Sequence, residues 1–195
     1  MPNKHSGSSI VELTSVVAIV AVLVSSAVPA VEGYYDKKRL IAAAEMVYSQ
    51  LQKARSEAIA RSEDVYVQFN VDDGQDWSLG LSTNTGCNPD HTLDDSNPCF
   101  LTVDDGDEVA GDGDRVLQTE TSKDFPGIRM AGVTFNSDSA KFDYVRGTGK
   151  AGSVKLESAG GYRLKVITSL IGRVRLCSPS GDAHVAGYPT KSCSW

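Results

Sequence analysis

The sequence lacks the short motifs that most often indicate an enzyme. It contains no GxSxG nucleophile motif, no HExxH metalloprotease motif and no GxxxxGK[ST] phosphate-binding loop. Its three histidines, at positions 5, 91 and 184, are scattered, and none of its four cysteines forms a CxxC pair, which disfavours a zinc site. No internal repeat is present. We therefore expect a non-catalytic protein that uses no metal and no cofactor.

Charge is nearly absent from the N-terminal part of the chain. Between Ser8 and Val31 the only formal charge is Glu12, and the 19 residues from Leu13 to Val31 carry none. A helix of that length, rising about 1.5 Å per residue, crosses most of a hydrocarbon core of about 30 Å. Residues 8–31 are therefore predicted to form a transmembrane or assembly helix. A cleaved signal peptide is less compatible with Glu12 and with a helical pattern that continues past Pro29.

A second helical pattern follows directly. Apolar residues recur in steps of three and four along one face, while most charges avoid that face. Residues 32–62 are therefore predicted to form an amphipathic helix, with Pro29 as a point of helix weakening between the two halves. The apolar face consists of Leu40, Ala44, Val47, Leu51, Ala54 and Ala58.

The remainder of the chain reads as short strands separated by Gly, Asn and Asp. An antiparallel sheet domain over residues 63–195, packed against the amphipathic helix, gives an α+β fold with one core. The expected strands lie at 65–69, 77–82, 99–103, 115–120, 133–136, 142–147, 153–157, 162–168 and 171–177.

Charge is unevenly distributed over this domain. Residues 72–124 carry 14 acidic and two basic side chains, whereas residues 125–195 carry four acidic and ten basic ones. Residues 72–124 are interpreted as an acidic insertion. The uneven charge distribution either keeps a long loop soluble or helps subunits dock head to tail. No register of the acidic run fits an EF-hand, so calcium binding is the weaker reading of Asp104, Asp105, Asp107, Asp112 and Asp114.

The four cysteines all follow the apolar segment. In an oxidising periplasm they are expected to pair, and three connectivities are possible. We favour Cys87 with Cys99 and Cys177 with Cys193, because these pairs close the shortest loops.

The N-terminus resembles that of type IV pilins and type II secretion pseudopilins in Gly7, Ser8, Glu12 and Pro29. The resemblance implies that a prepilin peptidase cuts after Gly7, which leaves residues 1–7 as the leader peptide, and methylates the amine of Ser8. The family usually has phenylalanine at the position of Ser8. It also implies an inner-membrane subunit with a periplasmic C-terminal domain, handled by an inner-membrane assembly platform.

Glu12 has a physical role within that resemblance. A buried carboxylate stays ionised when a cation meets it, and the terminal amine of a neighbouring subunit is such a cation. A contact of this end-to-side kind repeats without closing and so builds a filament of pilins or pseudopilins.

Two further segments resemble the GspH/FimT branch of this superfamily. These are the run from Ala54 to Ile59 and the segment LIGRVRLCSPSG near the C-terminus. The resemblance implies a minor pilin or pseudopilin, of a type IV pilus or a type II secretion system, that primes or caps filament assembly.

The GRVR part of the second segment opens an alternative. It resembles a pattern with which some FimT-like minor pilins bind DNA in natural transformation, and strand alternation would put Arg173 and Arg175 on one face. Lys150, Lys165 and Lys191 could extend such a basic patch.

Overall fold

The computed structural model describes residues 10–103 and 114–195, without the side chains of residues 26–30. Gly7 and Ser8 lie outside the described residues, as do Asp104, Asp105, Asp107 and Asp112. The chain divides into two compact units, residues 1–35 and residues 36–195, and each is considered by itself.

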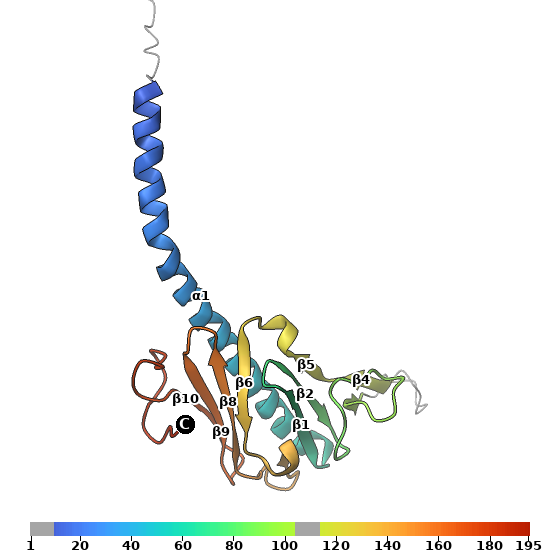
Figure 1. Cartoon of the computed structure of the whole chain (residues 1–195). Helices are drawn as coiled ribbons and strands as arrows, with labels where there is room; N and C mark the ends of the chain where they lie inside the picture. Colours follow the sequence, from blue (N-terminus) through green and yellow to red (C-terminus); the bar gives the residue numbers. More distant parts are fainter. Residues whose placement is uncertain (1–9, 104–113) are drawn as a thin grey trace, which may run out of the picture. The chain divides into compact units, whose positions relative to one another are not determined.

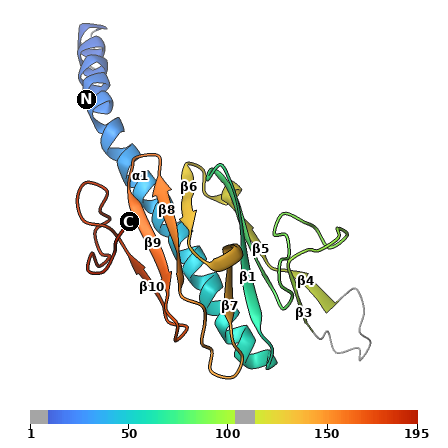
Figure 2. The same ribbon diagram turned by 60° about the horizontal axis from the view of Figure 1, so that its bottom comes forward.

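One helix, α1 (Ile10–Arg61), contributes residues to both units. In the second unit its predicted apolar face is confirmed, because all six residues of that face are fully buried together with Ala43. They join strand residues in a single hydrophobic core, and Figure 2 shows the helix running behind the strands. This burial explains the helix, since tertiary packing of an apolar face supplies most of a helix's stability in a protein.

The C-terminus of α1 is set by local geometry and by side-chain bonds. Ser62 adopts a φ of 55°, a left-handed conformation typical of helix ends, and the amide of Glu63 donates to the carbonyl of Ala58 at 3.3 Å. Arg61 bonds Glu57 at 2.7 Å and also donates to the carbonyl of Thr102. The last turn is thereby attached to the strand that contains Thr102.

The strands form two four-stranded antiparallel sheets and a two-stranded ribbon (Figure 1). One sheet has the order β5-β2-β1-β7, the other has the order β10-β9-β8-β6, and β3 pairs with β4. The two sheets are joined where the amide of Met130 donates to the carbonyl of Gly74 at 2.7 Å.

The ten strands have the following bounds: β1 (Val65–Asp72), β2 (Asp76–Ser82), β3 (Phe100–Thr102), β4 (Arg115–Leu117), β5 (Thr119–Thr121), β6 (Ile128–Val133), β7 (Ser139–Phe142), β8 (Gly152–Ser158), β9 (Arg163–Thr168) and β10 (Val174–Cys177). The short 3-10 helices η2 (Ser122–Asp124) and η3 (Asn136–Asp138) follow β5 and β6.

The strand expected at 142–147 is wrong, because β7 ends at Phe142. The carboxylate of Asp143 accepts hydrogen bonds from the amides of Val145 and Arg146 at 2.9 and 3.3 Å. Such bonds from a side chain to nearby amides compete with a strand ladder and turn the chain. The strand expected at 133–136 is displaced as well, since β6 ends at Val133.

Strand β2 is buried on both faces, although it lies inside the acidic segment 72–124. Trp77, Leu79 and Leu81 point into the core, while Ser78 and Ser82 are buried on the opposite face. The loop closed by the Cys87–Cys99 disulfide covers that opposite face. A Cβ on Gly80 would lie 2.5 Å from the Cβ of Cys99, so only glycine allows this approach. Part of the acidic segment is therefore a central strand of the sheet.

Both disulfides join the neighbouring cysteines favoured from the sequence. Cys87 pairs with Cys99 and Cys177 with Cys193, over Cα distances of 5.0 and 5.8 Å, which lie in the normal range for disulfides. The second bond attaches the C-terminal segment to the end of β10. The same segment bonds α1, because the hydroxyl of Tyr188 donates to Glu45 at 3.1 Å.

This Tyr188–Glu45 contact predicts a pH-dependent stability. Burial, with help from the bond to Glu45 and its charge, raises the pKa of Tyr188 from 10.0 to about 12. Because the folded protein holds this proton more tightly, the stabilisation is complete below pH 10 and is lost as the pH rises towards about 12. Between these values we expect the thermal midpoint of the wild-type chain to fall more steeply than that of Tyr188→Phe, measured by circular dichroism. If the thermal midpoints of the two proteins fall in parallel over this pH range, the stabilising role of the Tyr188–Glu45 contact is wrong.

Candidate functional site

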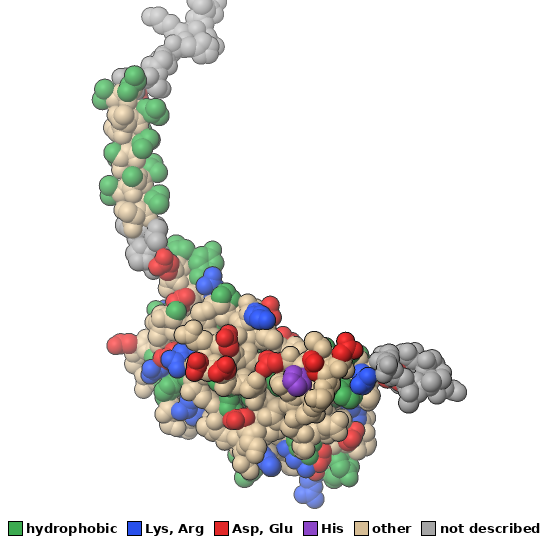
Figure 3. Space-filling view, turned by 45° about the vertical axis from the view of Figure 1, so that its right-hand side comes forward, with side chains coloured by type: hydrophobic (Ala, Val, Ile, Leu, Met, Phe, Trp, Pro, Cys, Tyr) green, Lys and Arg blue, Asp and Glu red, His purple; other side chains and the backbone are tan. Residues whose placement is uncertain are grey.

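The first unit presents an uncovered apolar helix surface. Every large aliphatic side chain between Ile10 and Val24 is more than half exposed, and Figure 3 shows hydrophobic side chains along the visible face of this helix segment. Glu12 lies in the first turn of α1 and is exposed among them. An apolar surface of this kind is stabilised when another apolar surface covers it, either lipid or other apolar helices.

The small polar residues of this segment are compatible with such surroundings. The hydroxyl of Thr14 donates to the carbonyl of Val11 at 3.0 Å, and that of Ser15 donates to the carbonyl of Glu12 at 2.8 Å. A hydroxyl satisfied within its own helix adds little cost on transfer to an apolar environment. Glu12 is thus the one strongly polar side chain between Ile10 and Ser25.

Two other predicted features of the segment lie outside what can be described. The cleavage and methylation positions, Gly7 and Ser8, precede the described residues, and the side chain of Pro29 is not described. The helix weakening at Pro29 stays a prediction. Over the described residues, no helix combines the length and apolar character needed to cross a membrane.

Arg173 and Arg175 both lie on the surface of the second unit. Arg173 precedes β10 and closes a turn in which the amide of Gly172 donates to the carbonyl of Ser169 at 2.9 Å, while Arg175 lies within β10. Both are exposed, with buried Val174 between them. Within the described part of the chain, neither guanidinium forms an ion pair. The two arginines can therefore contact an anionic partner.

The structure brings the Ala54–Ile59 run and the GRVR segment together through Arg55. A Cβ on Gly147 would lie 2.9 Å from Nε of Arg55, and one on Gly172 would lie 3.3 Å from it. Nε of Arg55 is itself buried, and among the described residues it has no hydrogen-bond partner. Arg55 thus packs under the turn that carries Arg173. Sequence reasoning missed this contact, because nothing in either segment alone indicates the other.

The three lysines suggested as an extension of the basic patch are differently placed. Lys165 donates to the carbonyl of Ser194 at 2.8 Å, and burial with the nearby Lys155 lowers its pKa, so this ammonium is engaged by the C-terminal segment. Lys150 lies in the β7–β8 loop and lines a cavity with Lys141 and Tyr66. Lys191 is exposed on the segment closed by the second disulfide. Lys165 therefore does not extend the patch.

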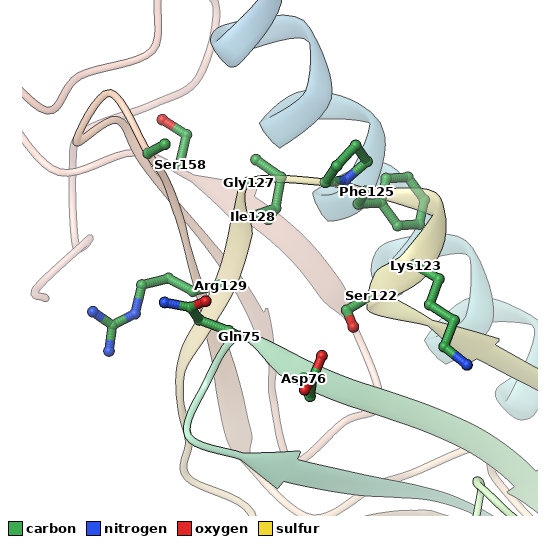
Figure 4. A pocket seen from close by; sticks show the side chains of 11 residues that line it. Gln75, Asp76, Ser122, Lys123, Phe125, Gly127, Ile128, Arg129 and Ser158 are labelled. Atoms are coloured by element: carbon green, nitrogen blue, oxygen red, sulfur yellow. The ribbon is translucent and has the colours of Figure 1, made fainter.

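The acidic segment offers no metal centre in its described part. Over residues 10–103 and 114–195, no group of three or more His, Cys, Asp or Glu side chains is placed to hold a metal ion. Acidic side chains do gather on the face of the second unit shown in Figure 3. A cavity of about 440 Å³ lies beside β2, η2 and β6, and Figure 4 shows residues that line it, among them Gln75 and Ser158.

Comparison with known proteins places these features in context. A family model described as type II transport protein GspH matches residues 43–185. Among solved structures, the chain is similar to the minor pseudopilin EpsH from the type 2 secretion system of Vibrio cholerae, with 16% identity, a TM-score of 0.48, and coverage of 73% of this chain and 99% of that one. It is also similar to the type IV minor pilin FimU of Pseudomonas aeruginosa, with 19% identity, a TM-score of 0.45, and coverage of 73% and 91%. No curated protein matches the sequence.

Proposed function

Because this chain belongs to the GspH family of type II transport proteins, we propose that it is a minor pilin or pseudopilin that primes or caps a filament. The observation that carries the proposal is the uncovered apolar surface of α1 from Ile10 to Val24, which includes a single carboxylate, Glu12. In the other half of the same helix, the apolar face is buried in the core of the second unit. One half of α1 thus holds a folded domain while the other is left for assembly.

The mechanism follows from the chemistry of the apolar half. Before assembly, residues 8–31 lie in the inner membrane, with the second unit in the periplasm. During assembly the helix moves from lipid into a bundle of neighbouring helices, where the apolar surface stays buried. Glu12 meets the terminal amine of an adjacent subunit, and this pair fixes the axial register because a buried charge is costly without its partner. The protein performs no chemical step in this role.

The proposal predicts the chemical form of the mature N-terminus. After purification of the full-length protein from membranes, we expect intact mass and peptide spectra to show a chain that begins at N-methylated Ser8. A chain that retains Met1, or one cleaved near Ala27, would contradict the proposal. The matched control is Gly7→Val, which should keep the leader peptide because a prepilin peptidase cuts after glycine.

DNA binding is a second candidate function, favoured by the exposed guanidiniums of Arg173 and Arg175, which form no ion pair with any residue that the structure describes. If each arginine contacts one phosphate, Arg173→Ala/Arg175→Ala should lower the slope of log affinity against log salt by roughly 2 for duplex DNA. A gel-shift titration of the full chain in detergent at several salt concentrations measures this slope. The charge-matched control is Lys123→Ala/Arg129→Ala, which removes two exposed cations outside this patch and should leave the slope unchanged. If the wild-type protein gives no gel shift at low salt, this function is excluded.

A further inference from the structure

The two ends of the second unit differ in charge. Strand β1 runs from Val65 to Asp72, so its ends lie roughly 23 Å apart. The end at Asp72 holds a cavity of about 250 Å³, lined by the carboxylates of Asp72, Asp76 and Asp90 and by the ammonium of Lys123. The opposite end carries the β7–β8 loop and the β9–β10 turn beside the C-terminus of α1, as Figures 1 and 2 show.

Backbone contacts hold this loop and this turn together. Phe142, which pairs with the first residue of β1, bridges to Gly149, and the amide of Gly149 donates to the carbonyl of Leu170 at 3.1 Å. A Cβ on Gly172 would collide with the carbonyl oxygen of Gly147, so the two backbones are in direct contact. The surface that they share is therefore fixed before any partner binds, which lowers the entropic cost of binding.

Aliphatic side chains protrude from this shared surface. Leu170 and Ile171, at the tip of the β9–β10 turn, are 69% and 66% exposed, and Val145 in the β7–β8 loop is 66% exposed. Ile59, near the end of α1, is 52% exposed, and its Cδ1 would lie 2.9 Å from a Cβ placed on Gly147. We call the side chains of Ile59, Val145, Leu170 and Ile171 the apolar tip. Aliphatic side chains gathered from three elements indicate an interaction surface.

Cationic side chains accompany the apolar tip. Arg146 follows Val145 directly, Arg173 lies two residues after Ile171, and Lys150 follows the bridge at the base of the β7–β8 loop. All three cations are exposed, and none of them forms an ion pair in the part of the chain that the structure describes. They are therefore available to an anionic partner.

The carboxylates of the same end are mostly engaged. Asp64 forms an ion pair with Lys141, and Asp143 accepts hydrogen bonds from the amides of Val145 and Arg146 at 2.9 and 3.3 Å. Glu63 is then the exposed carboxylate that stands against the three exposed cations. This end of the second unit thus combines an apolar tip with an excess of positive charge.

We propose that the apolar tip enters the surface of a lipid bilayer that contains anionic phospholipid. The aliphatic side chains reach the boundary between headgroups and acyl chains, while Arg146, Lys150 and Arg173 contact phosphate groups. This contact goes beyond the proposed function and does not depend on it, because it uses only residues of the second unit.

Two features favour a bilayer over DNA as the partner. The phosphate backbone of DNA pairs with cations but leaves aliphatic side chains in water. The apolar tip lies on two turns and at the end of a helix, so it is convex, and a fluid bilayer closes around a convex surface. The carboxylates at the Asp72 end are repelled by the same anionic lipid, which orients the second unit with the apolar tip towards the bilayer.

Co-flotation of the full chain with vesicles tests this contact. The protein is held through its apolar helix segment in fluorescent nanodiscs of phosphatidylcholine, and vesicles of equal parts phosphatidylglycerol and phosphatidylcholine are added. We expect protein and nanodisc to float together with these vesicles, but not with vesicles of phosphatidylcholine alone. Because the nanodisc floats as well, transfer of α1 into the vesicle cannot account for the result.

Two pairs of substitutions separate the apolar and the electrostatic parts. Leu170→Ser/Ile171→Ser should lower the affinity for the anionic vesicles at least about tenfold, because two aliphatic side chains are no longer buried in lipid. Its control is Val71→Ser/Val116→Ser, which changes two exposed valines outside the apolar tip.

Arg146→Glu/Arg173→Glu should also lower the affinity at least about tenfold, since two attractions to anionic lipid become repulsions. Its charge-matched control is Lys123→Glu/Arg129→Glu, which changes two exposed cations outside the apolar tip. Both control variants should bind like the wild type.

Other outcomes overturn the proposal. Nanodiscs that do not float with the anionic vesicles refute the contact, and flotation insensitive to Leu170→Ser/Ile171→Ser reduces it to a charge effect without the apolar tip. In living cells, p-benzoylphenylalanine at position 170 should crosslink to phospholipid. Crosslinks to a protein or to DNA alone would assign the apolar tip to that partner instead. Methylation of Ser8 tests the proposed function separately, and neither result decides the other.

Discussion

Replacing Glu12 by alanine is expected to abolish incorporation of the protein into filaments while leaving the second unit folded. Removing one partner of a desolvated ion pair costs about 3–5 kcal/mol, which corresponds to a roughly 100- to 4,000-fold loss in the assembly equilibrium. The second unit should not respond, because Glu12 belongs to the first unit and contributes nothing to the buried core. The measurement is the fraction of the protein in sheared filaments, or crosslinked to neighbouring subunits, relative to the membrane pool.

Two variants make the Glu12 result specific. Glu12→Gln keeps the size and hydrogen-bonding capacity of the side chain but removes its charge, and it should assemble nearly as poorly as Glu12→Ala. Glu32→Gln removes another exposed carboxylate of α1, and it should assemble like the wild type. Normal assembly of Glu12→Ala would show that the proposed pairing with a terminal amine is wrong.

Replacing Gly172 by alanine is expected to be strongly destabilising. Gly172 has a φ of 73°, and a Cβ there would lie 1.9 Å from the carbonyl oxygen of Gly147. The left-handed conformation alone costs about 1–2 kcal/mol for a residue with a Cβ. Because the obstacle is backbone, the two loops must separate, and we expect a total loss of about 3 kcal/mol or more in the free energy of unfolding. Urea unfolding of the full chain in detergent measures it.

Gly161 provides a matched control for the clash between a Cβ at position 172 and the carbonyl oxygen of Gly147. It has a φ of 80°, close to that of Gly172, but no other part of the described chain lies within 4 Å of a Cβ placed on it. Gly161→Ala should therefore show the conformational cost of about 1–2 kcal/mol without the clash. Equal losses in the two variants would show that the contact between the Gly147 and Gly172 loops carries no stability. A larger loss in Gly172→Ala explains the glycine of the GRVR segment by packing.

Periodic features of the fold could be predicted from the sequence. The buried face of α1 follows from the spacing of Leu40, Val47 and Leu51, because a helix repeats its faces every 3.6 residues and the rest of the core needs a cover. The disulfide pairing could be chosen because the shortest loops are the easiest to close. Both features depend on neighbours along the chain, which a sequence displays directly.

Features that depend on distant contacts could not be predicted. The sequence predicts a strand at 77–82, but it does not predict that the outward residues of this strand, Ser78 and Ser82, are buried, because that burial comes from a loop that folds back over them. The aromatic and β-branched residues after Phe142 predict a strand, but the carboxylate of Asp143 turns the chain there instead. The contact of Arg55 with the GRVR segment joins positions more than 100 residues apart.

Because the Cys87–Cys99 loop packs over β2, the accessibility of its two sulfur atoms reports whether the second unit has folded. Both cysteines are almost completely buried, at 3% and 0% exposure, so alkylating reagents and reductants reach the sulfur atoms only before the loop settles or after it lifts. Pulse-labelling with an alkylating reagent in living cells would then date the closure of this loop relative to the proposed leader cleavage, and show whether the second unit folds before or after that step.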